Sequence, residues 1–137
     1  MHRSKLIPVM VAVVFATFLA LSSVVAAQQV GDIKRNVLSK EDLGSVPGHE
    51  GLLVRVEFAP GAREGKHTHP GEVFAYVEEG AIILNVEGKP TVTVKAGEVF
   101  FIPAGKVHWG ENAGKTPAKA LVTFVVEKGK PLSSPAK

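Results

Sequence analysis

Residues 61–80 have the sequence GAREGKHTHPGEVFAYVEEG, and the pair His67 and His69 within them decides how the rest of the chain is interpreted. Side chains two residues apart in an extended segment point to the same side of a strand. Imidazole is the commonest metal ligand in proteins, so two of them on one face can bind one ion. Two solvated histidines at a strand edge are the alternative. A third histidine, His108, follows a second proline-glycine turn in GKVHWGEN and favours a metal site.

The first 27 residues of the 137-residue chain differ in composition from the rest. Basic residues 2–5 precede an almost unbroken apolar run at 6–21, and small residues end the segment at Ala27. This pattern is typical of a secretory signal peptide and predicts cleavage after Ala27. An uncleaved anchor is the alternative, but the apolar run is short for a span of roughly 20 residues. We therefore expect a periplasmic or secreted protein that contacts a membrane only through this leader, if it is uncleaved.

The composition after the leader narrows the range of partners and metal ligands. Residues 28–137 carry 14 basic and 13 acidic side chains, because Arg3 and Lys5 lie in the leader and no acid does. This balance, without a basic stripe interleaved with aromatic residues, argues against nucleic acid as a partner. The chain contains no cysteine, so nitrogen and oxygen must hold any metal. The length after the leader suits a single domain with one core.

Short apolar or alternating segments separated by turn residues fill the chain after the leader. Their spacing, without a helical period, predicts an all-β sandwich or barrel. Residues 39–43 are expected to form one helical turn with Ser39 as its N-cap. Residues 63–69 are polar for a strand in a core, and the tail at 128–137 is expected to be loose. The predicted strands are 33–38, 52–58, 63–69, 73–77, 81–86, 91–95, 99–102, 106–110 and 118–127, with a hairpin turn at 87–90.

Two segments of the chain resemble the two sequence motifs of the cupin family. In residues 61–80, the first glycine is followed after five residues by His67, Thr68 and His69, then by an acid and Gly80. In residues 97–112, GEVFFIPAGKVHWGEN, the pattern of glycines, proline, His108 and Asn112 is similar to the second motif. The resemblance implies a small single-domain cupin at 28–137. Its all-β fold would be the double-stranded β-helix, or jelly-roll barrel.

The resemblance also implies that His67, His69 and His108 converge on one divalent metal ion inside the barrel. Cupins of this size often form dimers, so a homodimer is expected, through a sheet face or an exchanged terminal strand at 28–38. Asn112 completes the second motif, and we expect it to have a structural role through hydrogen bonds in a turn.

The fourth ligand that cupins usually supply, a glutamate of the first motif, is displaced in this sequence. Counting back from Gly80, Val73 occupies that position, and Glu72 lies one residue earlier. Strand alternation turns Glu72 to the opposite face, unless a bulge at residues 70–71 rotates it inward. Three imidazoles alone suit Fe, Zn, Cu or Ni as the divalent ion, whereas a carboxylate from Glu72 would favour Mn.

The function is less constrained than the fold, because one fold of this kind hosts many chemistries. The leading hypothesis is a metal-dependent, dioxygenase-like oxidoreductase that acts on a small molecule through dioxygen activation at iron(II). An isomerase or a hydrolase is the nearest variant. The alternatives from other classes are a module that binds a small molecule or sequesters metal without turnover, and an interaction protein with a structural metal.

Overall fold

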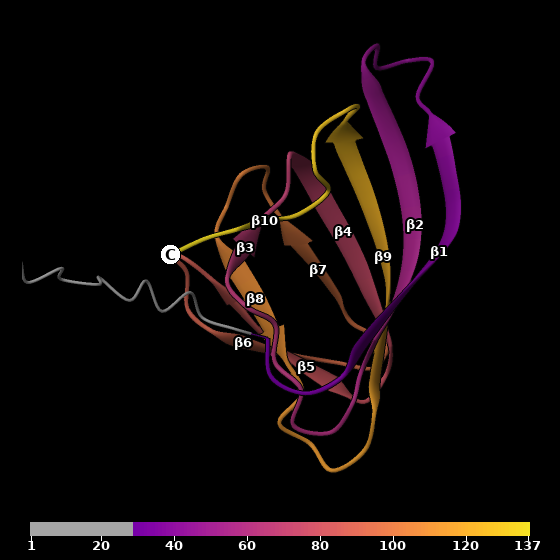
Figure 1. Ribbon diagram of the computed structural model, residues 1–137. Coiled ribbons are helices and arrows are strands. Elements are labelled where there is room, and N and C mark those ends of the chain that lie inside the picture. Colours follow the sequence, from indigo (N-terminus) through magenta and orange to yellow (C-terminus); the bar gives the residue numbers. More distant parts are fainter. Residues whose placement is uncertain (1–28) are drawn as a thin grey trace, which may run out of the picture.

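In a computed structural model, which describes residues 29–137, the chain forms two five-stranded sheets that face each other (Figure 1). Strands follow the order β1-β2-β9-β4-β7 in the first sheet and β10-β3-β8-β5-β6 in the second, and paired strands are antiparallel. This architecture confirms the predicted all-β jelly roll. The strands are β1 (Ile33–Asp42), β2 (His49–Phe58), β3 (His67–Thr68), β4 (Gly71–Glu79), β5 (Ala81–Val86), β6 (Val92–Lys95), β7 (Val99–Ile102), β8 (His108–Glu111), β9 (Ala118–Glu127) and β10 (Ser134–Pro135).

The core lies between the two sheets, and strand alternation builds it. Strands β2, β4, β5 and β9 bury every second residue along most of their length, because successive side chains point to opposite faces of a sheet. In β9 the buried residues are Ala118, Ala120, Val122, Phe124 and Val126. Burial of a side chain the size of valine or phenylalanine contributes roughly 1.5–3 kcal/mol. The alternation found in the sequence is therefore the pattern that fixes which face of each strand is internal.

Two local predictions were wrong for the same physical reason, and the strand predicted at 63–69 forms only at His67–Thr68. The helical turn expected at residues 39–43 does not form, because β1 continues to Asp42 and pairs with β2 as far as Glu50. The tail expected to be loose contains β10, which pairs with β3 next to the first two histidines. In both places pairing with another strand overrides the local preference of a polar segment.

The predicted signal peptide, residues 1–27, lies outside the described residues. The leader and the domain boundary after Ala27 therefore stay predictions. Residues 29–137 include no helix that is long and apolar enough to cross a membrane.

Candidate metal centre

The structure brings together the three predicted histidines on one side of the space between the sheets. His67 in β3 lies opposite His108 in β8, and His69 follows two residues later on the same face as His67. The ring centroids are 4.3 Å apart for His67 and His108, 4.9 Å for His67 and His69, and 5.0 Å for His69 and His108. One nitrogen from each ring lies within 4.8 Å of the others, so two segments of the chain can offer three ligands to one ion.

Backbone carbonyls fix which nitrogen of each ring is free. The Nδ1 of His67 lies 2.8 Å from the carbonyl oxygen of Gly65, that of His108 lies 2.8 Å from Lys106 O, and that of His69 lies 2.6 Å from Leu132 O. A carbonyl oxygen only accepts hydrogen bonds, so each Nδ1 carries the proton and donates it. The three Nε2 atoms therefore keep their lone pairs, as a metal site requires.

Burial keeps two of the three rings neutral. Burial is the main cause that lowers the pKa of His69 to about 4. The hydrogen bond to Leu132 opposes this shift, whereas His67, His108 and Arg35 add to it. Burial also lowers the pKa of His108, although the hydrogen bond to Lys106 opposes this shift. Neutral imidazole is the form that binds a metal, so both rings are in the binding form at neutral pH.

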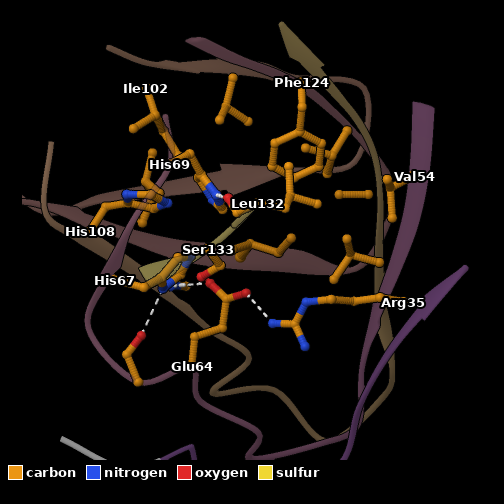
Figure 2. Close-up of a pocket in the computed structure, with 18 of the residues that line it drawn as sticks. Arg35, Val54, Glu64, His67, His69, Ile102, His108, Phe124, Leu132 and Ser133 are labelled. Atoms are coloured by element: carbon orange, nitrogen blue, oxygen red, sulfur yellow. Dashed lines mark hydrogen bonds and ion pairs between the residues drawn. The ribbon is translucent and has the colours of Figure 1, made fainter. Parts of the chain in front are cut away.

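The histidines border a cavity of about 570 Å³ (Figure 2). Its wall is mainly apolar and comes from both sheets, and His69 packs edge-on against Phe124 of the opposite sheet with ring centroids 4.9 Å apart. The volume is in the range of small-molecule sites, in which an apolar wall surrounds a few polar groups. Besides the histidines, the cavity is lined by Arg35 and Glu64 and by Leu132, Ser133 and Pro135 of the C-terminal tail.

The sequence profile of the cupin domain matches residues 54–124, which include all three histidines. The chain belongs to the cupin family. Germin-like protein subfamily 2 member 2 of Arabidopsis thaliana is 40% identical over 87 residues, which cover 58% of this chain and 40% of that protein. Oxalate oxidase 2 of Hordeum vulgare is 31% identical over 118 residues, which cover 78% of this chain and 53% of that protein. This cupin thus spans about half the length of the curated relatives that it matches, or less.

Solved structures show the same fold. A cupin-like protein from Thermotoga maritima has a TM-score of 0.62 at 26% identity, and the match covers 79% of this chain and 78% of that one. An oxalate oxidase in complex with the substrate analogue glycolate has a TM-score of 0.54 at 32% identity, with 58% of this chain and 44% of that one covered.

The residues present fit the divalent metal that the cupin family implies. Three imidazoles with free Nε2 atoms on one side of a cavity form a donor set that suits Fe, Zn, Cu or Ni. The hydrogen bond on each Nδ1 orients its ring and raises its basicity as a ligand. His67, His69 and His108 would hold the ion, and the cavity would admit a small ligand beside it.

Glu72 does not join the three histidines. It is exposed on the outer face of β4, whereas its neighbour Val73 faces the core and is 2% exposed. The inward rotation by a bulge at residues 70–71 does not occur: β4 pairs with β9 in continuous register from Gly71 to Val77. A Cβ at Gly71 would overlap the carbonyl oxygen of Val125, so close packing against β9 holds the strand in this register. The position of the missing carboxylate is therefore filled by an apolar side chain.

Sequence reasoning missed three groups that contribute to the site. Glu64, Arg35 and the carbonyl of Leu132 all face the cavity. The polar composition of residues 63–69 was the available signal for Glu64, and Arg35 shares a strand face with Ile33 and Val37. The Leu132 carbonyl left no signal, because every residue has one.

Asn112 has the structural role predicted for it. Its side chain is buried, donates to the carbonyls of Phe58, Ala59 and Thr116, and accepts a hydrogen bond from Gly114 N. These bonds tie the loop after β8 to the end of β2, at the end of the strand that carries His108.

Proposed function

We propose that this cupin is a dioxygenase-like oxidoreductase that works in the periplasm or outside the cell. In this proposal His67, His69 and His108 hold one iron(II) ion, and the substrate is a small organic molecule in the adjacent cavity. The observation that carries the proposal is the set of three imidazoles whose Nε2 atoms are free at one side of a large apolar cavity. The leader predicted at residues 1–27 supports the location.

The residues of the chain would bind the ion, orient its ligands and limit the access of water. When bound, iron(II) would supply the redox chemistry through which dioxygen reacts with an organic substrate. The carbonyls of Gly65, Lys106 and Leu132 hold the rings in the tautomer that offers Nε2. The apolar wall lowers the local dielectric around the reacting groups. The relative that was solved with glycolate supports a small carboxylate as the first substrate to test.

Two measurements on the protein test this proposal. Loaded anaerobically with iron(II), it should give the electron paramagnetic resonance signal of a nitric oxide adduct, because three protein ligands leave coordination positions open. It should then consume oxygen when small carboxylates such as glycolate and oxalate are added. The His67→Ala variant should lose both signals, whereas His49→Ala, a change outside the cavity, should keep them. Iron that binds with no accessible position would contradict the proposal.

A binding module without turnover is the second candidate, and one observation favours it. Among residues 29–137, Glu64 is the only carboxylate that lines the cavity. Both of its oxygens are engaged, one by Arg35 and one by the backbone N–H of Gly110. A site without a free acid or base suits binding better than proton transfer. Glycolate that binds to the iron-loaded protein without oxygen consumption would favour this candidate.

We also propose that the protein forms a homodimer through the outer face of β4 and β7. Phe74, Tyr76, Val99 and Phe101 form an apolar patch there and are between 44% and 72% exposed, and the rings of Phe74 and Phe101 pack with centroids 4.9 Å apart. In the part of the chain that the structure describes, β7 is an edge strand, so a symmetric copy could also pair with its backbone. Sedimentation should show a dimer that Val99→Glu dissociates. A monomeric wild-type protein at micromolar concentration would contradict this assignment.

A further inference from the structure

An arginine on the inner face of β1 faces the cavity but is only partly engaged. Arg35 lies in β1 opposite Val56 of β2, and its side chain borders the cavity together with Val37. Its Nη2 donates to Oε1 of Glu64 at 2.7 Å, and the side chain of Arg35 is 44% exposed. A guanidinium group has five N–H donors, so this single bond leaves most of them available to a ligand.

Glu64 is a rigid support for Arg35. Its side chain is 14% exposed, and Oε2 accepts a hydrogen bond of 2.9 Å from Gly110 N. Its own backbone N–H donates to the carbonyl oxygen of Gly110 at 2.9 Å. Gly110 lies two residues after His108 on the same face of β8, so one strand fixes a metal ligand and the carboxylate that holds Arg35. Figure 2 shows Glu64 between the histidine side of the cavity and Arg35.

A second arginine–glutamate pair on the outer face of the same sheet shows what is unusual about Arg35. Arg55 uses both Nε and Nη2 to bind the two carboxylate oxygens of Glu78, at 2.9 and 3.1 Å. That pair is a bidentate salt bridge, in which the carboxylate accepts two parallel hydrogen bonds from the Nε–H and Nη–H groups of the guanidinium. Arg35 offers the corresponding Nε–H and Nη–H groups to a second carboxylate.

The charges around the cavity favour an anionic ligand. The charges of Arg35 and Glu64 balance each other. Lys66 also borders the cavity, and its ammonium group lies 5.2 Å from the centroid of the Trp109 ring and 3.7 Å from Glu87. Imidazole is an uncharged ligand when it binds a metal, so three histidines would leave the charge of a divalent ion uncompensated, because Glu72 faces away. An anion that reaches both the ion and Arg35 would therefore meet an uncompensated positive charge at one end and the free N–H donors of a guanidinium group at the other.

We propose that Arg35 is the second anchor of an anionic ligand: it binds a carboxylate of the molecule that lies beside the three histidines. The recognised class is a small organic acid with an apolar or short body, because the wall between the two anchors is apolar. Arg35 contacts the ligand directly, and Glu64 acts as a positioning residue for it. This inference rests on the proposed function, since it places the rest of the ligand at the metal centre.

The test compares Arg35→Gln with its matched control, Arg55→Gln, which removes a guanidinium group from the outer face. Each protein is loaded with zinc, which has no redox chemistry of its own, and its zinc content is measured by elemental analysis. Calorimetry then measures the binding of glycolate and succinate, with ethylene glycol as an uncharged probe. The same titrations are repeated without metal.

Arg35→Gln should weaken the binding of both carboxylates about ten- to a hundredfold, because it removes a charge-assisted contact. The zinc content and the binding of ethylene glycol should stay at the wild-type value, and Arg55→Gln should change neither. Equal carboxylate affinity in the wild-type and Arg35→Gln proteins at equal zinc content would overturn this inference and leave the proposed function intact. A wild-type protein that binds neither carboxylate would overturn it too.

Failure of the metal site gives a different result. A wild-type protein that holds no zinc contradicts the proposed function, whatever the carboxylates do. In that case the titrations of the metal-free proteins decide on Arg35, because its contact with a carboxylate does not need the ion. A weaker affinity in Arg35→Gln than in Arg55→Gln would then still support the anchor, and equal affinities would exclude it.

Discussion

The inner and outer surfaces of the barrel carry the same residue types with different consequences. Glu64 lies three residues before His67 and faces the cavity, where it accepts hydrogen bonds from Arg35 and Gly110. Glu72 lies three residues after His69 and is exposed on the outer face of β4. Equal distance in the sequence thus gives one acid a place in the site and leaves the other in solvent. The direction of a side chain relative to the sheet decides its role.

The same contrast provides matched controls, because several inner residues have an outer counterpart. His49 at the start of β2 is not among the residues that line the cavity, whereas His108 is 3% exposed and borders it. Gly44 lies in an open turn, and Gly110 lies against Glu64. Substitutions in such pairs change the same residue type inside and outside the site, so they separate an effect on the site from a general effect on the fold.

The largest expected effect is the loss of metal from His108→Ala. Loss of a residue that only orients a metal ligand typically costs 10- to 100-fold in affinity, and loss of the ligand itself should cost at least about a hundredfold. Elemental analysis after dialysis against a weak chelator should find wild-type metal content in His49→Ala and little in His108→Ala. Equal retention by the two variants would mean that the inner histidines do not form the site.

Acid should destabilise the metal-free protein through its inner histidines. The pKa of His69 is lowered to about 4 in the folded state and is about 6.5 in an unfolded chain. Between these values the unfolded chain binds a proton that the folded one does not. The free energy of unfolding should therefore fall as the pH falls from about 6.5 to 4, by up to about 3 kcal/mol.

Urea denaturation between pH 4 and 7 measures this effect. The slope against pH should become shallower in His69→Gln, which removes the buried titrating group, and should persist in His49→Ala. A slope that is the same in wild type and His69→Gln would assign the acid sensitivity to other groups.

A smaller effect is expected from Gly110→Ala, because the added methyl group would contact Glu64, the residue that positions Arg35. A Cβ at residue 110 would lie 3.2 Å from Glu64 Oε2, 3.3 Å from Phe58 Cζ and 3.4 Å from Ile82 Cγ2. Overpacking of this kind costs about 1–3 kcal/mol of unfolding free energy. Among the described residues, no heavy atom other than those of its chain neighbours lies within 4 Å of a Cβ at Gly44, so Gly44→Ala should change the urea midpoint little. Similar midpoints for the two variants would show that Glu64 can move aside.

Much of the fold was predictable because alternation acts within a single strand. The apolar segments at 81–86 and 99–102, bounded by turn residues, and the alternating segment at 118–127 predicted strands with the observed bounds. At 118–127 the period of two also states which side chains are buried. The three histidines were predictable for a related reason. His67 and His69 share a face by spacing, and the motif around His108 supplied the third ring.

The remaining parts of the site depend on contacts between segments that are distant in the sequence. Glu64 turns inward because its backbone pairs with Gly110, and the tail reaches His69 because β10 adds to β3. The expected helical turn at 39–43 failed because pairing with the next strand, β2, extends β1. A local pattern does not contain such pairings, so the sequence indicated Glu72 as a candidate ligand and did not indicate Glu64, which faces the cavity.

The smallest expected effect, that of Glu72→Ala, decides the number of ligands. Glu72 is exposed and lies in a strand held in continuous register from Gly71 to Val77, so its removal should leave the metal content unchanged and shift the unfolding free energy by no more than about 0.5 kcal/mol. The metal-binding isotherm of Glu72→Ala should overlay that of the wild type for both zinc and manganese. A selective loss of manganese binding would show that β4 rotates when the ion binds and brings the carboxylate inside. Overlaid isotherms would leave a site of three neutral ligands, whose uncompensated charge is the reason an organic acid would bind between the ion and Arg35.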